Sequence, residues 1–251
     1  MILDDIISRT RERAGLLPAS FPRDSRNRYA SLSHAIRSTR GKNAIIAEIK
    51  TASPSRGTIR RNVDLASMAQ AFVSGGCVAL SILTEPYYFC GSVRDIPLVK
   101  DVVEVPVLRK DFIIDRRQIA ETRALGADAV LLIASLLGGR LPEFVDDACD
   151  EGLEPLVEVH TPADVEIARS TRAGMVGINN RDLATLTIDR STTRVLSPLV
   201  RSAGRIVVCE SGITSAGDVR QLRPFCDAFL IGTSIMAHDE PEKKLEELVC
   251  A

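Results

Sequence analysis

Eight short apolar runs, each followed by a segment with helical spacing, constrain the fold of this chain most strongly. Each run has the length of a buried strand, and successive runs start roughly 20 to 35 residues apart. The runs are continuous rather than alternating, which is typical of parallel strands buried on both faces. We expect strands at residues 44–49, 77–83, 106–108, 129–133, 155–159, 175–178, 206–209 and 228–231.

The segments between the runs carry the start and stop signals of helices. DLASMAQAFVSGG, DRRQIAETRALG and LPEFVDDACDEG have apolar residues at helical spacing. Acidic or hydroxyl residues stand where a side chain would cap the first turn, and glycines stand where helices end. The expected N-caps are Asp64, Asp115 and Thr161, with Pro162 at a first helical position and Gly75, Gly126 and Gly152 at helix ends.

Eight consecutive strand-helix units predict an α/β fold, a single (β/α)8 TIM barrel. We expect one domain over residues 1–251, with the eight units in 44–251 and an N-terminal helical extension in 1–43 that covers one end of the barrel. An open dinucleotide-binding sheet would need a G-x-G-x-x-G turn after its first strand. The segment here reads KTASPSRG, which lacks that pattern.

Composition excludes several classes of partner. The chain has 251 residues and 45% hydrophobic residues, with 32 basic against 33 acidic side chains, so no basic excess suggests nucleic acid or an anionic membrane. The longest nearly apolar stretch, AVLLIASLL, is about half of the roughly 20 residues that a membrane-spanning helix needs. The first residues lack the basic region of a secretory signal. We therefore expect a cytoplasmic protein.

Cysteine and histidine spacing predicts no metal site. The six cysteines are scattered without a C-x-x-C pair, and a reducing cytosol favours free thiols. Only three histidines are present, and they stand far apart in the sequence. We expect neither a metal nor a cofactor.

Polar residues concentrate where the predicted strands end, which is where barrel enzymes place their catalytic groups. Glu48 and Lys50 end the first strand, and the alternation of side chains places them on one face. The third strand leads into Lys110, and Glu158 lies at the end of the fifth. Ionisable groups that converge on one opening are costly to bury unless substrate or chemistry uses them. This set therefore predicts an active site.

The last two strands end in small and hydroxyl residues. Glu210-Ser211-Gly212 follows the seventh strand, and Gly232-Thr233-Ser234 follows the eighth. Free backbone N–H groups at such turns bind anions, and these two loops are the usual phosphate site of a barrel. The pattern predicts a substrate with a terminal phosphate.

Taken together, the motifs resemble those of the indole-3-glycerol phosphate synthase family of tryptophan biosynthesis. The resemblance extends over the whole barrel, and K-x-x-S-P-S-x-G followed by L-R-K-D-F is its most specific part. The matching segments are AEIKTASPSRGTI (47–59), SILTEPYYF (81–89), LRKDFIID (108–115), GADAVLLIAS (126–135), LVEVH (156–160), GINNRDL (177–183) and ESGI (210–213).

The resemblance implies a carboxy-lyase that converts 1-(2-carboxyphenylamino)-1-deoxyribulose 5-phosphate into indole-3-glycerol phosphate, carbon dioxide and water. Lys110 matches the family's general acid and Glu158 its general base. Glu48 and Lys50 match a second carboxylate-amine pair, which takes part in dehydration and, with Ser53, holds the substrate carboxylate. The resemblance leaves open which lysine donates at which step.

The resemblance also implies residues that bind the rest of the substrate. Asn179 and Arg181 match positions on the sugar and phosphate side, and Glu210 occupies another site position. The apolar positions that would hold the benzene ring are Phe89, Phe112, Leu131 and Leu183. The phosphate positions are Ser211, Gly212, Gly232, Thr233 and Ser234.

Two other functions fit a phosphate-binding barrel. A barrel like phosphoribosylanthranilate isomerase would use a cysteine and an aspartate at its strand ends, whereas the first strand here ends in Glu48 and Lys50. An inactive barrel that only binds a phosphorylated ligand would not need the full set of ionisable groups. The polar outer face of the last predicted helix, with Glu242, Lys243 and Glu246, is typical of a solvated surface, and we expect a monomer.

Overall fold

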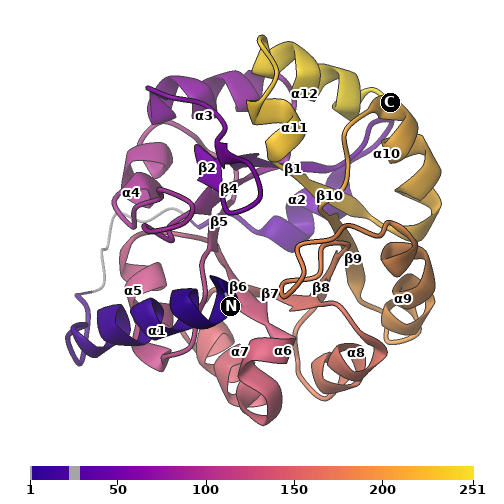
Figure 1. The fold of residues 1–251 in the computed structure, drawn as a ribbon. Coiled ribbons are helices and arrows are strands. Elements are labelled where there is room, and N and C mark those ends of the chain that lie inside the picture. The colour runs from indigo at the N-terminus through magenta and orange to yellow at the C-terminus, as the bar shows by residue number, and fades with distance from the viewer. Residues whose placement is uncertain (1, 23–28) are drawn as a thin grey trace.

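The eight predicted strands close into one parallel barrel in a computed structural model that describes residues 2–22 and 29–251. The strands follow one another around the barrel in chain order, and the first pairs with the last, so no strand edge is left open (Figure 1). They are β1 (Ile45–Ile49), β4 (Ala79–Leu83), β5 (Val107–Lys110), β6 (Ala129–Ile133), β7 (Glu154–Val159), β8 (Met175–Asn179), β9 (Ile206–Glu210) and β10 (Ala228–Ile231).

Helices surround the barrel, as Figure 1 shows. Within the described ranges, none of them combines the length and the apolar character that crossing a bilayer requires. The helices are α1 (Ile2–Gly15), α2 (Leu32–Ser38), α3 (Leu65–Ser74), α4 (Asp95–Lys100), α5 (Arg116–Ala124), α6 (Ala134–Leu137), α7 (Leu141–Asp150), α8 (Pro162–Arg169), α9 (Ser191–Arg201), α10 (Ala216–Leu222), α11 (Thr233–Met236) and α12 (Pro241–Val249), with 3-10 turns η1 (Gly138–Arg140) and η2 (Arg223–Phe225).

The predicted helix starts are confirmed. The side chain of Asp64 accepts from the backbone of Ala66 and Ser67 at the start of α3. Asp115 and Thr161 each form a capping box, in which the cap side chain and the third helical residue satisfy each other's backbone N–H groups. These local bonds satisfy the free N–H groups that every helix N-terminus exposes.

Alternation along each strand separates two apolar layers. Ile45, Ala47 and Ile49 of β1 face the surrounding helices, whereas Ile46 faces the barrel interior. The same parity holds in β7, where Val157 packs outward and the interior position is Leu156. Because side chains alternate, the residues that share parity with the interior layer point inward at the strand ends.

Several strands extend further than predicted. Lys110, Asn179 and Glu210 are the last residues of β5, β8 and β9, although the apolar runs stop before them. Hydrogen bonding to neighbouring strands continues beyond the apolar run, and Asn179 pairs in register with Glu210. A short antiparallel hairpin, β2 (Ala52–Ser53) with β3 (Gly57–Thr58), was not predicted.

The N-terminal extension contacts both ends of the barrel, not one as expected. Leu32 and Ile36 of α2 are buried in the interior cluster, and Ser33 donates to Glu154, the first residue of β7. Helix α1 lies at the opposite end, where Arg13 binds Asp111 just after β5. A connection of more than ten residues separates the two helices, and it includes residues 23–28, which lie outside the described residues.

Asn43, a buried residue just before β1, forms hydrogen bonds to the C-terminal end of α12 and the residues that follow it. Its side chain donates to the carbonyl oxygens of Leu248 and Ala251 at 3.0 Å each, and its backbone N–H donates to Val249. Because β1 closes the barrel against β10, these bonds stabilise the closure.

We expect Asn43→Ala to lower the free energy of unfolding by about 2 kcal/mol, because buried carbonyl groups lose their donor. The melting temperature should fall by about 4 to 8 °C for a chain of this size. Urea unfolding followed by circular dichroism measures the loss. Glu246→Gln on the exposed face of α12 is the control and should leave stability unchanged; equal stability of both variants would contradict the role of Asn43.

Candidate active site

A cavity of about 330 Å³ opens at the carboxyl ends of the strands. Its lining includes every residue predicted for the site except Ser53. Side chains from β1, β5, β7, β8 and β9 meet there, together with residues of the loops that follow β9 and β10. The barrel thus brings together positions that are up to 186 residues apart in the sequence, from Glu48 to Ser234.

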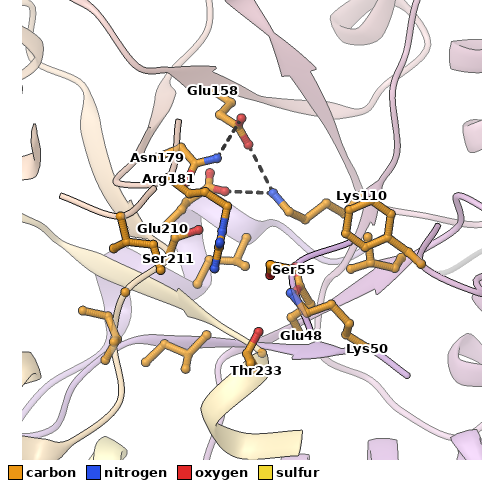
Figure 2. Close-up of a pocket in the computed structure, with 18 of the residues that line it drawn as sticks. Glu48, Lys50, Ser55, Lys110, Glu158, Asn179, Arg181, Glu210, Ser211 and Thr233 are labelled. Atoms are coloured by element: carbon orange, nitrogen blue, oxygen red, sulfur yellow. Dashed lines mark hydrogen bonds and ion pairs between the residues drawn. The ribbon is translucent and has the colours of Figure 1, made fainter. Parts of the chain in front are cut away.

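Lys110 is the centre of the charged part of the cavity. Its Nζ lies 3.2 Å from Oε2 of Glu158 and 2.9 Å from Oε2 of Glu210. Figure 2 marks both contacts with dashed lines. Asn179 donates from Nδ2 to the other oxygen of Glu158 at 3.0 Å. Each of these side chains comes from a different strand, so the barrel holds the ammonium group between two carboxylates.

Burial and neighbouring charges act in opposite directions on the pKa values of Lys110 and Glu210. Burial would lower the pKa of Lys110, but Glu210, Glu158 and Glu48 outweigh it and raise the pKa above its ordinary value, which keeps the ammonium protonated. Burial raises the pKa of Glu210 to about 7, and the attraction of Lys110 offsets only part of this effect. Near neutral pH, Glu210 can therefore carry a proton, whereas Lys110 keeps its own.

Glu210 fits only because residue 177 of β8 has no side chain. A Cβ atom at Gly177 would lie 2.0 Å from Oε1 of Glu210, a distance that no real contact reaches. That oxygen is buried and has no hydrogen-bond partner within the described residues 2–22 and 29–251. The glycine thus provides the space into which the carboxyl group folds.

Glu48 and Lys50 form a second pair on the opposite side of the cavity. Nζ of Lys50 lies 2.8 Å from Oε1 of Glu48, and both side chains point inward from the end of β1, as predicted from their spacing. A Cβ atom at Gly232 would lie 2.6 Å from the same oxygen of Glu48. A glycine therefore makes room for this carboxylate too.

The loops after β9 and β10 form the small-residue end of the cavity. Ser211 and Gly212 both adopt positive φ angles, 65° and 81°, which turn the chain sharply after β9. Within the described residues, the N–H groups of Gly212 and Ile213 have no acceptor in the protein. Ser234 donates its hydroxyl to the carbonyl of Ile213 at 2.8 Å, which joins the two loops.

An apolar wall closes another side of the cavity. Phe89 and Phe112 line it with ring centroids 6.4 Å apart and planes tilted by 42°. Leu131 of β6 and Leu183 after β8 also line it. An aromatic ring of a ligand would be shielded from water here, which strengthens the neighbouring electrostatic interactions.

The first loop contains the one predicted site residue that does not line the cavity. Ser53 is buried in β2, its hydroxyl has no partner among the described residues, and it does not line the cavity. The hairpin pairs Ser53 with Gly57, so the residues at its tip, Ser55 and Arg56, face the cavity instead. Sequence reasoning missed both, because only the pairing of the hairpin decides which of its residues form the tip.

Arg56 lies close enough to Arg181 to affect the pKa of its guanidinium group. Burial lowers the pKa of Arg181, and the positive charge of Arg56 lowers it further. Arg181 donates to the carbonyl oxygen of Leu186. Two neighbouring guanidinium groups at a cavity wall favour an anionic ligand.

Nearly the whole chain matches one family of proteins. The family model described as indole-3-glycerol phosphate synthase matches residues 4–248. The chain belongs to this family. A relative named indole-3-glycerol phosphate synthase from Methanocaldococcus jannaschii is 45% identical over 227 residues, which cover 89% of this chain and 85% of the relative. The enzyme of that name from Geobacillus kaustophilus is 42% identical over 252 residues, covering 98% and 96%.

Solved structures support the barrel fold of this family member. A tryptophan synthase structure from M. tuberculosis superposes with a TM-score of 0.67 at 13% identity, covering 88% of this chain and 98% of the other. A structure of KGPDC from Streptococcus mutans has a TM-score of 0.61 at 12% identity, covering 82% and 95%. At such low identity, the similarity concerns the fold alone.

We expect Gly177→Ala to lower turnover by about 100-fold, because the added methyl group displaces Glu210 from Lys110. Gly174→Ala is the matched control, since a Cβ there meets nothing within 4 Å. Steady-state assays and melting curves of both variants measure the effect. Normal turnover in Gly177→Ala would mean that the position of Glu210 does not matter.

We also expect a carboxyl group in the unliganded enzyme to titrate near pH 7, where burial places the pKa of Glu210. Difference infrared spectroscopy should show a protonated carboxyl band that is present below this pH and disappears above it. The band should be missing in Glu210→Gln. A band that persists in this variant would belong to another group.

Proposed function

We propose that this chain closes the indole ring of 1-(2-carboxyphenylamino)-1-deoxyribulose 5-phosphate, releasing carbon dioxide and water to form indole-3-glycerol phosphate. The observation that carries the proposal is Lys110, held between Glu158 and Glu210 next to the pair of rings Phe89 and Phe112. Family membership supports the same reaction. The substrate has an aromatic ring, a reactive carbonyl and a terminal phosphate, and the cavity offers a matching region for each.

The apolar wall favours one orientation of the substrate. Its benzene ring would lie against Phe89, Phe112 and Leu131, and its phosphate would lie at the loops after β9 and β10. The carbonyl group then falls between these regions, near Lys110. Holding the reacting atoms in place removes much of the entropic cost of ring closure.

Ring closure needs an acid at the carbonyl oxygen. The ring carbon that bears the carboxylate attacks the C2 carbonyl, and Lys110 donates a proton to the oxygen that becomes a hydroxyl. The three surrounding glutamates keep Lys110 protonated until that moment. Loss of carbon dioxide then restores the aromatic ring.

Dehydration needs a base and a second acid. A proton leaves the methylene carbon next to the nitrogen, and the hydroxyl departs as water, which completes the indole. Glu158, held by Asn179, is positioned to accept the proton, and the Glu48 and Lys50 pair lies across the cavity to assist departure of the hydroxyl. The substrate carboxylate would be held by Lys50, while Ser53 would act on the first loop only indirectly, through its carbonyl oxygen, which accepts from the backbone N–H of Arg56.

Phosphate binding would rest on backbone N–H groups. Gly212 contributes a free N–H group after β9, and Gly232 and Thr233 form the turn into α11. Ser234 already donates its hydroxyl to Ile213, so among the hydroxyls of the last loop we assign the phosphate contact to Thr233. Arg181 and Arg56 add positive charge on the sugar side.

The chain should carry out this reaction as a monomer. One barrel supplies Lys110, Glu158 and Glu210 together with the loops after β9 and β10, which are the groups that the proposed reaction uses. Light scattering combined with size-exclusion chromatography measures the oligomeric state.

The direct test is to supply the carboxyphenylamino-deoxyribulose phosphate and to follow indole fluorescence together with release of carbon dioxide. Lys110→Met keeps the length of the side chain and removes its charge. We expect turnover to fall by about 100-fold to 10,000-fold, because the positioned proton donor is gone. The Michaelis constant should change much less, since Lys110 acts mainly in the transition state.

Lys243→Met is the matched control, because Lys243 is exposed on α12 and does not line the cavity. It should keep full turnover. If Lys110→Met kept more than about a tenth of wild-type turnover, Lys110 would not be the acid, and Lys50 would be the next candidate. A wild-type protein that forms no indole would overturn the proposed function itself.

A further inference from the structure

Helix α1 binds two loops that supply walls of the cavity, although within the described residues none of its own side chains lines that cavity. The hydroxyl of Tyr88 donates to Oδ2 of Asp5 at 2.6 Å, and Tyr88 precedes the wall residue Phe89. Arg13, in the last turn of the helix, binds Asp111 in the next loop. The helix thereby connects the two loops that carry Phe89 and Phe112.

The contact between Arg13 and Asp111 has the geometry of a strong ion pair. Nη2 of Arg13 lies 2.9 Å from Oδ1 and 3.0 Å from Oδ2 of Asp111, and Nη1 lies 3.3 Å from the carbonyl oxygen of Thr84. The side chain of Asp111 is fully buried, whereas that of Arg13 is 23% exposed. A buried carboxylate needs such partners, because its charge is otherwise costly to desolvate.

A second cation, Arg109, also binds Asp111, but Arg109 binds another carboxylate as well. Arg109 lies 3.2 Å from Asp111 through Nη2, and its Nη1 lies 2.8 Å from Glu121 of α5. One guanidinium group thus serves two carboxylates. Arg13 is therefore needed to balance the charge of Asp111, and it supplies that charge from outside the barrel.

Asp111 in turn holds the turn that follows β5. Its Oδ1 accepts from the backbone N–H of Phe112 at 2.9 Å, and its Oδ2 accepts from the hydroxyl of Thr84 at 2.6 Å. The residues on either side of it are Lys110 and Phe112, which line the cavity. Whatever fixes Asp111 also fixes the backbone from which the ammonium group of Lys110 extends.

We propose that Arg13 is a positioning residue for the reaction, which acts through Asp111 to hold Lys110 and Phe112 in place. This inference rests on the proposed function. Helix α1 would then contribute to catalysis indirectly, because only the side chain of Asp111 separates Arg13 from the loop residues that would contact substrate.

The test compares three variants on the same helix. Arg13→Met removes the charge and should lower kcat by about 10-fold to 100-fold at a temperature where the protein is folded, because Lys110 loses its alignment. KM should change much less, since Arg13 does not reach the cavity. Arg13→Lys restores a positive charge and should recover part of kcat. Arg11→Met is the control, because Arg11 contacts neither loop through an ion pair or hydrogen bond within the described residues, and it should match the wild type.

A double-mutant cycle shows whether Arg13 acts through Asp111. Arg13→Met should cost little further kcat in an Asp111→Asn background, because the group that it serves is already neutral. Equal kcat in Arg13→Met and wild type, or a loss that affects only the melting temperature, would overturn the inference. A full further loss of kcat in the double variant would also overturn it.

If Arg13→Met does not fold, the comparison is made with Arg13→Lys and Arg13→Gln. Because wild-type turnover is measured first, failure of this inference is distinct from failure of the proposed function.

Discussion

The partly buried ammonium group of Lys110 is the constraint on which the rest of this structure depends. A positive charge at the end of β5 can remain there only if carboxylates compensate for its lost hydration, and Glu158 and Glu210 do so at 3.2 and 2.9 Å. Those two carboxylates then repel each other, and burial already raises the pKa of Glu210. In the resulting cluster Lys110 keeps its proton, whereas Glu210 can gain or lose one near neutral pH, the range in which acid and base catalysts work.

Space for these charges comes from glycines in the barrel wall. Gly177 and Gly232 lie where any Cβ would collide with Glu210 or Glu48. Glycine is required at both positions because no side chain fits there, and not for its backbone freedom, since neither residue has a positive φ. Gly212 differs, because its φ of 81° is needed for the sharp turn after β9. The same residue type thus performs two physical tasks at the cavity, one inside the barrel wall and one in a loop.

The N-terminal extension shows that local sequence signals can predict helices without predicting their tertiary contacts. Its helical character could be predicted from the sequence, but the parts of the barrel that its helices contact could not. Leu32 and Ile36 of α2 pack into the apolar cluster of the barrel interior. Arg13 of α1 instead binds Asp111, nearly a hundred residues away in the sequence, at the other end of the barrel. No local pattern around Arg13 or Asp111 identifies the other as its partner, because an ion pair between distant segments depends on where the barrel places them.

The sequence by itself determined the number, order and type of the barrel strands, because buried parallel strands require continuous apolar runs and crossover helices require caps. It also determined that Glu48 and Lys50 share a face, since alternation is a local property of a strand. Only the tertiary structure decided that Lys110 lies between Glu158 and Glu210, that Arg56 rather than Ser53 faces the cavity, and that α1 supports the turn after β5. Strand register, hairpin pairing and the closure of the barrel set these contacts, and each of them depends on residues far apart along the chain.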